Sequence, residues 1–213
     1  MELQPETLKK SLQHQLTGNR SHQKMAPASR VGDVEIAKLK GDYATAKKSA
    51  VMILMYNEAK HTKVIFIRRS FYVGIHAGQI AFPGGRFEPE DVTLDNTALR
   101  EIEEEIGVKP NEINVLGRLS DIFVPASNFI ISVFVGFLKQ KPIYVPDYRE
   151  VAEIIEIDLS EFFEHDVISE KVFLVPSATQ SIRAPYYKAG NIELWGASAM
   201  VMTELIDMIR HEV

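Results

Sequence analysis

The chain has 213 residues and a formal charge of −5, which favours one globular domain with a sizeable core and argues against a surface that coats nucleic acid. It contains no cysteine, so disulfides, thiolate metal sites and cysteine nucleophiles are excluded. The first residues lack a basic flank followed by an apolar stretch, and the apolar run 129–138 is too short to span a bilayer. We therefore expect a cytoplasmic protein that has neither a membrane nor a nucleic acid as its partner.

The first 48 residues differ in charge from the rest of the chain. They hold nine Lys or Arg and five Asp or Glu, whereas the remainder has an excess of acids. Leucines recur at helical spacing over residues 8–16, and the polar residues after them are interrupted by Gly and Pro. We predict an N-terminal helix and polar arm over 1–48 and a main domain over 49–213. Lys24 and Arg30 either help to hold an anionic substrate or belong to a solvated extension packed on the body.

Short β-rich segments begin the main domain. The runs 50–56 and 63–69 are separated by a polar turn, which predicts a hairpin. Residues 79–82 predict a short strand, and the Pro-Gly-Gly sequence at 83–85 predicts a turn. Glycine at such a turn allows positive φ and a close approach of the backbone to a ligand.

A helix with one acidic face comes next and ends at Gly107, which is suited to the C′ position. At 100° per residue, Glu101, Glu104 and Glu105 lie within roughly 100° of one another, while Glu103 points away. The opposite face carries Leu99, Ile102 and Ile106. The helix therefore packs its apolar side on a sheet and turns its acids outward.

The clustering of three acids on one face of the helix is unfavourable without a compensating charge. Like charges three or four positions apart each destabilise a helix by about 0.2–0.5 kcal/mol. A hard divalent cation such as Mg²⁺ or Mn²⁺, bound by carboxylate oxygens, offsets that repulsion. The alternative interpretation is an acidic face exposed to solvent.

The second half of the chain alternates between β-rich and helical segments. Further strands are predicted in the runs 113–124, 129–138, 171–176, 182–190 and 191–196. The run 150–163 starts as a strand and passes into a helix near Asp158 or Ser160, and residues 197–211 form an amphipathic closing helix. Mixed strands with helices on either face predict an α/β fold, built as an α/β/α sandwich with a mixed central sheet.

The strand, glycine turn and acid-faced helix together resemble the Nudix hydrolases, which cleave diphosphates linked to another moiety. The family signature runs Gly-x5-acid, then Arg-Glu-hydrophobic-x-Glu-Glu-x-Gly-hydrophobic. Its last part is matched at every position by Arg100, Glu101, Ile102, Glu104, Glu105, Gly107 and Val108. The resemblance implies the α/β/α sandwich and a diphosphatase activity.

Features around this signature are similar to the Nudix branch that acts on coenzyme A. Asp91 stands six positions after Gly85, and Arg100 comes one residue later than the general spacing. Upstream lie Arg69-Ser70, His76, Gly78-Gln79 and the run 81–85. The C-terminal run 192–206 also looks like the last strand and helix of that branch. Gly74 stands where that branch often has a basic residue.

The resemblance implies roles for particular residues. Glu101, Glu104 and Glu105 are expected to bind Mg²⁺ or Mn²⁺, with the carbonyl of Gly85 as a further ligand, and one of these glutamates is a candidate for the base. Arg100 stays protonated, so its expected role is to fix a glutamate by a bidentate contact. The residues expected to contact substrate are Arg69, Ser70, His76, Gln79 and Gly84.

Several residues have two interpretations. Glu150 is an extra base from a second loop or an ordinary exposed acid. His76 either contacts a phosphate or serves as a base, or it is structural. Arg68 and Arg69 either contact a phosphate or are solvated charges at a strand edge. Trp195 with the tyrosines at 186–187 either stacks an adenine or belongs to the core.

The expected reaction is hydrolysis of coenzyme A or its thioesters to 3′,5′-ADP and (acyl-)4′-phosphopantetheine. One alternative is a broader pyrophosphatase for ADP-ribose or dinucleotides, and another is a binding module with the same fold and no turnover. The expected partner is a small diphosphate resembling coenzyme A, and a homodimer is left open.

Overall fold

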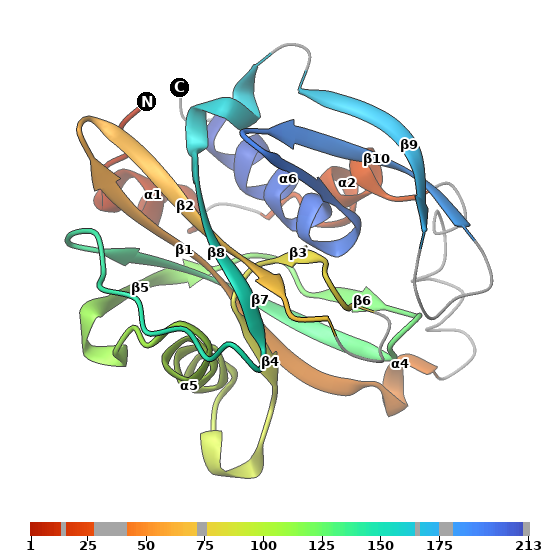
Figure 1. The fold of residues 1–213 in the computed structure, drawn as a ribbon, viewed down its shortest axis with the longest axis horizontal. Helices are drawn as coiled ribbons and strands as arrows, with labels where there is room; N and C mark the ends of the chain where they lie inside the picture. The colour runs from red at the N-terminus through yellow and green to blue at the C-terminus, as the bar shows by residue number, and fades with distance from the viewer. Residues whose placement is uncertain (14–15, 28–41, 72–75, 165–166, 175–180, 211–213) are drawn as a thin grey trace.

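The computed structural model describes residues 1–13, 16–27, 42–71, 76–164, 167–174 and 181–210 (Figure 1). The expectations for Arg30, Gly74 and His211 concern positions outside these ranges. Within them the chain forms an eight-stranded mixed sheet, a separate three-stranded sheet and helices on both faces of the larger sheet.

The larger sheet is built around β1, and its core order is β3-β2-β1-β7-β5. Its strands are β1 (Lys47–Glu58), β2 (His61–Arg69), β3 (Ile80–Ala81), β4 (Gly84–Arg86), β5 (Ile113–Arg118), β6 (Ile122–Val124), β7 (Phe129–Leu138) and β8 (Val151–Asp158). β1 runs parallel to β7 and antiparallel to β2, which confirms the predicted hairpin. The first half of β1 pairs with β4 and its second half with β2, so the neighbour of β1 on this edge changes along its length.

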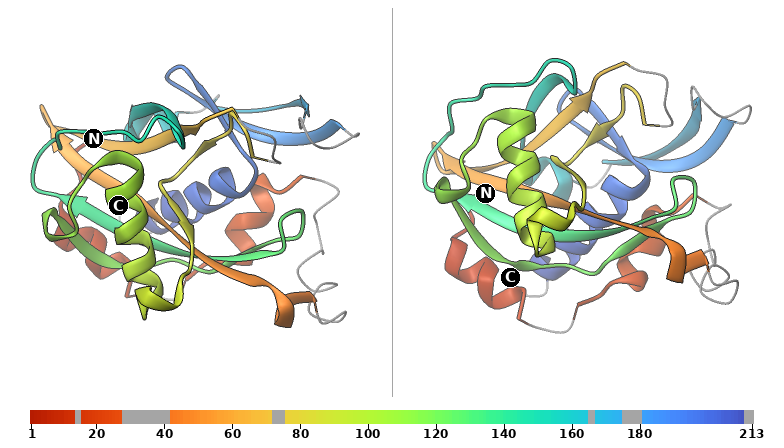
Figure 2. Two further views of the ribbon diagram at one scale, coloured as in Figure 1. Left: turned by 60° about the horizontal axis from the view of Figure 1, so that its bottom comes forward. Right: turned by 90° about the horizontal axis from the view of Figure 1, so that it is seen from below.

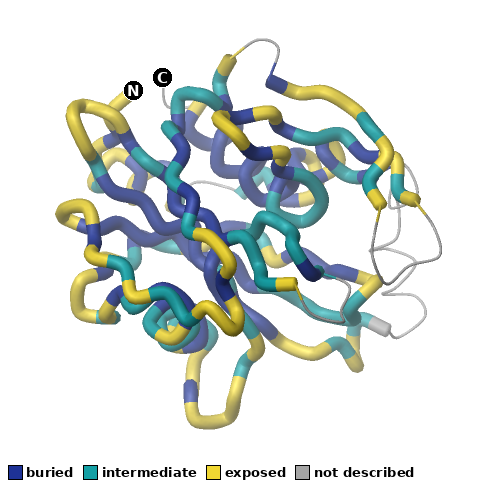
Figure 3. Tube along the Cα trace, in the orientation of Figure 1, coloured by how far each residue is buried: buried dark blue, intermediate teal, exposed yellow. Residues whose placement is uncertain are grey.

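Two long helices cover the larger sheet, α5 (Leu94–Ile106) and α6 (Gly196–Arg210), and Figure 2 shows them on opposite sides of it. Successive residues of a strand face opposite sides, so β1 serves both layers. Met52 and Leu54 pack in one core with Ile102 of α5, whereas Ile53 and Met55 belong to the core on the α6 side. Figure 3 shows the middle of these strands buried. The α/β/α sandwich with a mixed central sheet is confirmed.

The smaller sheet is antiparallel and consists of β9 (Ile168–Leu174), β10 (Ser181–Ala189) and β11 (Ile192–Trp195) in the order β11-β10-β9. Its strands were expected, but their separation from the central sheet was not. The short helices are α1 (Pro5–Ser11), α2 (Asn19–His22), η1 (Gln23–Met25), α4 (Asp42–Thr45), η3 (Pro89–Asp91), η4 (Pro110–Glu112) and η5 (Leu159–Phe163). Among the described residues, no helix is long and apolar enough to cross a membrane.

The described part of the N-terminal segment packs against α6. Leu8 and Met25 are buried in the same core as Leu205. The fully buried Glu204 accepts hydrogen bonds from the Gly18 amide at 2.9 Å and from His22 at 2.9 Å. Burial alone would raise the pKa of Glu204, but the bonds from His22 and Ser120 outweigh it and lower that pKa. The division of the chain at residue 48 stays a prediction.

Asp207, one turn further along α6, completes this docking. Its carboxylate accepts a hydrogen bond from Ser21 at 2.5 Å and two from Lys24 at 2.6 and 2.7 Å. Lys24 is thus engaged by α6, which favours the interpretation of a segment packed on the body over one that holds substrate.

One local prediction is wrong. The turn expected at 83–85 is only a bend at Pro83, because Gly84 and Gly85 belong to β4 and pair with β1. Gly84 has a φ of 145°, and a Cβ at this position would overlap the carbonyl oxygen of Ala50. The close backbone approach that requires this glycine is therefore made to β1.

Candidate active site

The expectation that α5 turns its acids outward is wrong for two of them, because Glu105 and Glu101 are turned against β4. The helix ends at Gly107, whose φ of 77° lies in the left-handed region. The side chain of Glu105 is 1 % exposed and that of Glu101 12 %, whereas Glu104 is 58 % exposed at the outer end of the same face. Glu103 points away from them and pairs with Lys109 at 2.6 Å.

Glu105 is the most buried of these carboxylates. Its Oε2 accepts a hydrogen bond from the Gly84 amide at 2.8 Å, and its Oε1 lies 3.6 Å from Nη1 of Arg69. Oε1 is buried and has no hydrogen-bond partner among the described residues. Burial raises the pKa of Glu105 to about 8, although Arg69 and the Gly84 amide oppose the shift. A buried carboxylate with an unused oxygen is suited to bind a cation.

Glu101 lies next to it, against β4. A Cβ on Gly85 would overlap the Glu101 carboxylate, so a larger residue there would displace the carboxylate from this position. Burial raises the pKa of Glu101, and the charges of Glu104 and Glu150 act in the same direction, while Arg100, 3.0 Å away, lowers it. Repulsion among these acids is therefore present in the fold.

Arg100 differs from the expectation in its main partner. Its bidentate contact goes to Asp91, from Nε at 2.7 Å and Nη2 at 3.2 Å, and not to a glutamate of the helix. Glu104 receives a single bond at 2.9 Å, and the Arg86 carbonyl receives another at 3.0 Å. The Arg100 guanidinium lowers the pKa of Asp91 to about 2. Asp91, which the sequence marked only as an unusual loop acid, thus anchors Arg100 and ties the η3 loop to the helix.

The carboxylates are turned toward separate partners. Glu105 faces Gly84, Glu101 faces Gly85, and Glu104 faces Arg100. As they stand, no three acidic or histidine side chains in the described ranges converge on one point. Oε1 of Glu105, which accepts no hydrogen bond from the described part of the chain, and the repulsion between Glu105 and Glu101 nevertheless fit a divalent cation. For Glu104 to bind the same cation, its hydrogen bond to Arg100 would have to break.

A second loop brings Glu150 to this region. The amide of Asp147 donates to the Glu105 carbonyl at 3.1 Å, and the Ser70 amide donates to the Glu150 carbonyl at 2.8 Å. Glu150 is exposed, and its charge contributes to the raised pKa values of Glu101 and Glu105. The loop therefore holds an acid beside the cluster, as the interpretation of an extra base requires.

The expected substrate residues are brought together at the end of β2 and the start of β3. The Arg69 amide donates to the Gln79 carbonyl at 3.0 Å, and the ring of His76 is 3.0 Å from the Gln79 side chain. The hydroxyl of Ser70 donates to the Tyr148 carbonyl at 3.1 Å. Of the set, Arg69 and the Gly84 amide reach the carboxylates directly.

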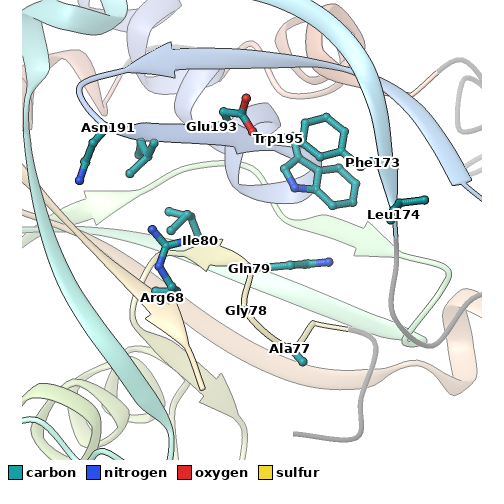
Figure 4. A pocket seen from close by; sticks show the side chains of 11 residues that line it. Arg68, Ala77, Gly78, Gln79, Ile80, Phe173, Leu174, Asn191, Glu193 and Trp195 are labelled. Carbon is teal, nitrogen blue, oxygen red and sulfur yellow. The ribbon is translucent and has the colours of Figure 1, made fainter. Parts of the chain in front are cut away.

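A pocket of about 310 Å³ opens beside β3, between it and the smaller sheet (Figure 4). We call it the Trp195 pocket, and the lining residues used below are Arg68, Gln79, Phe173, Asn191, Glu193 and Trp195. The sequence offered Trp195 as a stacking residue or a core residue, and the structure lines the pocket with it. Tyr187 is buried in the core, where its hydroxyl is 2.8 Å from that of Thr203.

Comparisons with known proteins agree with this geometry. The model of the NUDIX domain family matches residues 46–175. The "Uncharacterized Nudix hydrolase NudL" of Yersinia pestis (strain Pestoides F) is 30 % identical over 175 residues, which cover 78 % of this chain and 81 % of that protein.

Solved structures share the fold at low sequence identity. A MutT/nudix family protein from Enterococcus faecalis is similar with a TM-score of 0.54 and 16 % identity, covering 93 % of this chain and 76 % of that one. The MutT protein from Methanosarcina mazei Go1 has a TM-score of 0.50 and 17 % identity, over 78 % and 94 % of the two chains. With its signature residues gathered on α5, the chain belongs to the Nudix family and is a Nudix diphosphatase.

Proposed function

We propose that this enzyme uses Mg²⁺ or Mn²⁺ to hydrolyse the diphosphate of coenzyme A or acyl-coenzyme A, forming 3′,5′-ADP and (acyl-)4′-phosphopantetheine. The observation that carries the metal-dependent hydrolysis is the buried oxygen of Glu105 that accepts no hydrogen bond from the described residues, in a carboxylate whose pKa is raised by burial and by the charges of Glu101 and Glu150. Such a cluster is stable near neutral pH when a divalent cation compensates its charge.

The residues have distinct roles in this proposal. Glu101, Glu104 and Glu105 would hold the metal ion together with the Gly85 carbonyl. When bound, the metal neutralises phosphate oxygens and lowers the pKa of the attacking water. Arg100 is fixed by Asp91, and it orients Glu104 through a hydrogen bond while the metal ion is absent.

Glu150 takes the proton from the attacking water. The water oxygen forms a bond to one phosphorus, and the bridging oxygen leaves with the other phosphate. Because Glu150 is exposed on its own loop, it can accept that proton without disturbing the buried ligands.

The choice of coenzyme A rests on the run 76–85 and on the lengthened loop that contains Asp91. That loop is well organised, since the Asp91 carboxylate accepts bonds from the Glu88 amide at 2.9 Å and from Thr97 at 2.8 Å. Among the cations considered for the anionic substrate, Arg69 is beside the carboxylates, whereas Lys24 is engaged by Asp207. Arg69 and Ser70 would thus contact the diphosphate.

A substrate panel tests the proposal. The purified protein is assayed with coenzyme A, 3′-dephospho-coenzyme A, ADP-ribose and a diadenosine polyphosphate, each with Mg²⁺ and with Mn²⁺, and products are separated by chromatography. We expect the highest kcat/KM for coenzyme A. The products should be 3′,5′-ADP and 4′-phosphopantetheine, each of which keeps one phosphate of the original diphosphate. Equal values for coenzyme A and its 3′-dephospho form would mean that the 3′-phosphate is not recognised. A clear preference for ADP-ribose would replace the proposal with a broader nucleotide diphosphatase.

A further inference from the structure

The Trp195 pocket lies immediately beside the carboxylate cluster but on the other face of the sheet. Arg68 and Arg69 are consecutive in β2, next to an irregularity in its pairing with β8, and the residues before them alternate between the two cores, with Phe66 on the α6 side and Ile67 on the α5 side. Arg68 lines the pocket, and Arg69 contacts Glu105. Gln79, which also lines the pocket, bonds to Arg69 through the backbone at 3.0 Å. The end of β2 and the residue before β3 therefore border both the carboxylate cluster and the pocket.

The pocket offers a flat and rigid aromatic surface. The rings of Trp195 and Phe173 are stacked, with centroids 4.3 Å apart and an interplanar angle of 10°. Tyr186 packs edge-on against Phe173 at 5.7 Å, and the Lys171 ammonium lies 4.9 Å from the Phe173 centroid. Figure 4 shows Trp195 and Gln79 on facing walls, so the indole borders the open volume.

The charges around the pocket are compensated. Arg68 is paired with Glu153 at 2.8 Å, and Glu193 is paired with Lys171. A phosphate would need an excess of positive charge that these pairs do not provide. The pocket thus favours a neutral group, and coenzyme A has two: the purine base and the pantetheine arm.

A planar ring suits this surface better than a flexible chain. Stacking on an aromatic side chain uses the whole face of a purine base and immobilises few bonds. The pantetheine arm would lose the freedom of many rotatable bonds to lie on the same surface. The amides of Asn191 and Gln79 also stand at the pocket wall, where amides commonly recognise base edges.

We propose that the Trp195 pocket binds the purine base of the nucleotide half of the substrate by stacking on the indole. This inference rests on the proposed function for the identity of the whole substrate, but not for the presence of a base. It assigns the smaller sheet, much of which lies beyond the matched range 46–175, to substrate selection.

Trp195 is the only tryptophan of the chain, so its fluorescence reports the pocket directly. The metal-free protein is titrated with 3′,5′-ADP, with AMP and with 4′-phosphopantetheine. We expect saturable quenching by the two adenine nucleotides and none by 4′-phosphopantetheine. Quenching by 4′-phosphopantetheine alone, or by none of the three, overturns the proposal. If coenzyme A is not hydrolysed while AMP still quenches, the proposed substrate fails and the base pocket stands.

Two variants test the same point without fluorescence. Trp195→Leu should raise the inhibition constant of 3′,5′-ADP by about 5- to 150-fold, the range that loss of one base stack produces. The inhibition constant of 4′-phosphopantetheine should stay unchanged, and a wild-type circular dichroism spectrum with a cooperative thermal unfolding transition should show that the variant is folded. Trp195→Phe keeps a stacking face and should recover most of the loss. An equal rise for both inhibitors, or a rise for neither, would contradict a base-binding role.

Discussion

Replacing Glu105 by glutamine tests whether the ionised, buried carboxylate destabilises the metal-free protein and binds the metal ion. Glutamine has nearly the same shape and can keep the bond from the Gly84 amide, which is 2.8 Å from Oε2 in the wild type. It cannot ionise, so it removes the charge that burial disfavours. Glu103→Gln is the matched control, because this glutamate lies on the same helix but pairs with the exposed Lys109.

The size of the effect follows from the pKa of Glu105, which burial raises from 4.5 to about 8. Between these values the folded protein holds a proton that the unfolded chain has released, so the free energy of unfolding falls as the pH rises. The loss is about 1.4 kcal/mol for each pH unit in this interval. Above pH 8 the ionised Glu105 therefore destabilises the metal-free protein by roughly 3–5 kcal/mol, and below about pH 4.5 the penalty is absent.

Urea unfolding in the presence of a chelator, at pH 5, 7 and 9, measures this difference. We expect Glu105→Gln to lie within about 1 kcal/mol of the wild type at pH 5 and to exceed it by several kcal/mol at pH 9. Adding Mn²⁺ or Mg²⁺ at pH 9 should stabilise the wild type, by about 2.7 kcal/mol at a hundred times the dissociation constant, and should stabilise the variant much less.

The control defines what would refute this reasoning. Glu103→Gln should follow the wild type at every pH. If Glu105→Gln also follows the wild type at every pH, burial does not disfavour the ionised form of Glu105. A metal that stabilises Glu105→Gln as strongly as the wild type would mean that Glu105 is not a ligand.

Three further outcomes follow from the site. Chelation should abolish hydrolysis and Mg²⁺ or Mn²⁺ should restore it, which a rate assay with confirmed metal removal checks; full activity in excess chelator would end the proposed mechanism. Glu104→Gln should lower kcat by about 100-fold or more, whereas Glu103→Gln should be nearly silent, and equal losses would show that the acidic face is wrongly assigned. Asp91→Asn should lower the free energy of unfolding by about 1–3 kcal/mol, because it weakens the charged bonds to Arg100. That difference should vanish as the pH falls from about 4 toward 2, where the wild-type Asp91 itself becomes protonated.

The features that the sequence predicted well are set by neighbours along the chain. The acidic face of α5 follows from positions three and four apart, and its end at Gly107 follows from the one residue type that tolerates a left-handed φ without strain. The β1–β2 hairpin likewise needed only two β-rich runs and a short turn between them.

The features that sequence reasoning missed depend on residues far apart. Gly84 looked like a turn residue because its requirement comes from Ala50 of β1, more than thirty positions away. Asp91 lies too far from Arg100 for helical spacing to reveal their contact. Phe173 and Trp195 meet only because β9 and β11 flank β10 in a sheet of their own.

The contact between the N-terminal segment and α6 affects how the protein folds during synthesis. Gly18 and His22 meet Glu204 across more than 180 positions, so this closure cannot form on the ribosome until α6 has emerged. Until α6 packs against them, the apolar side chains of Leu8 and Met25 stay exposed and can associate with other chains. A fragment restricted to the matched range 46–175 would lack both halves of the closure. We expect such a fragment to aggregate, and a truncation study of this enzyme must keep residues 1–27 and 196–210 together.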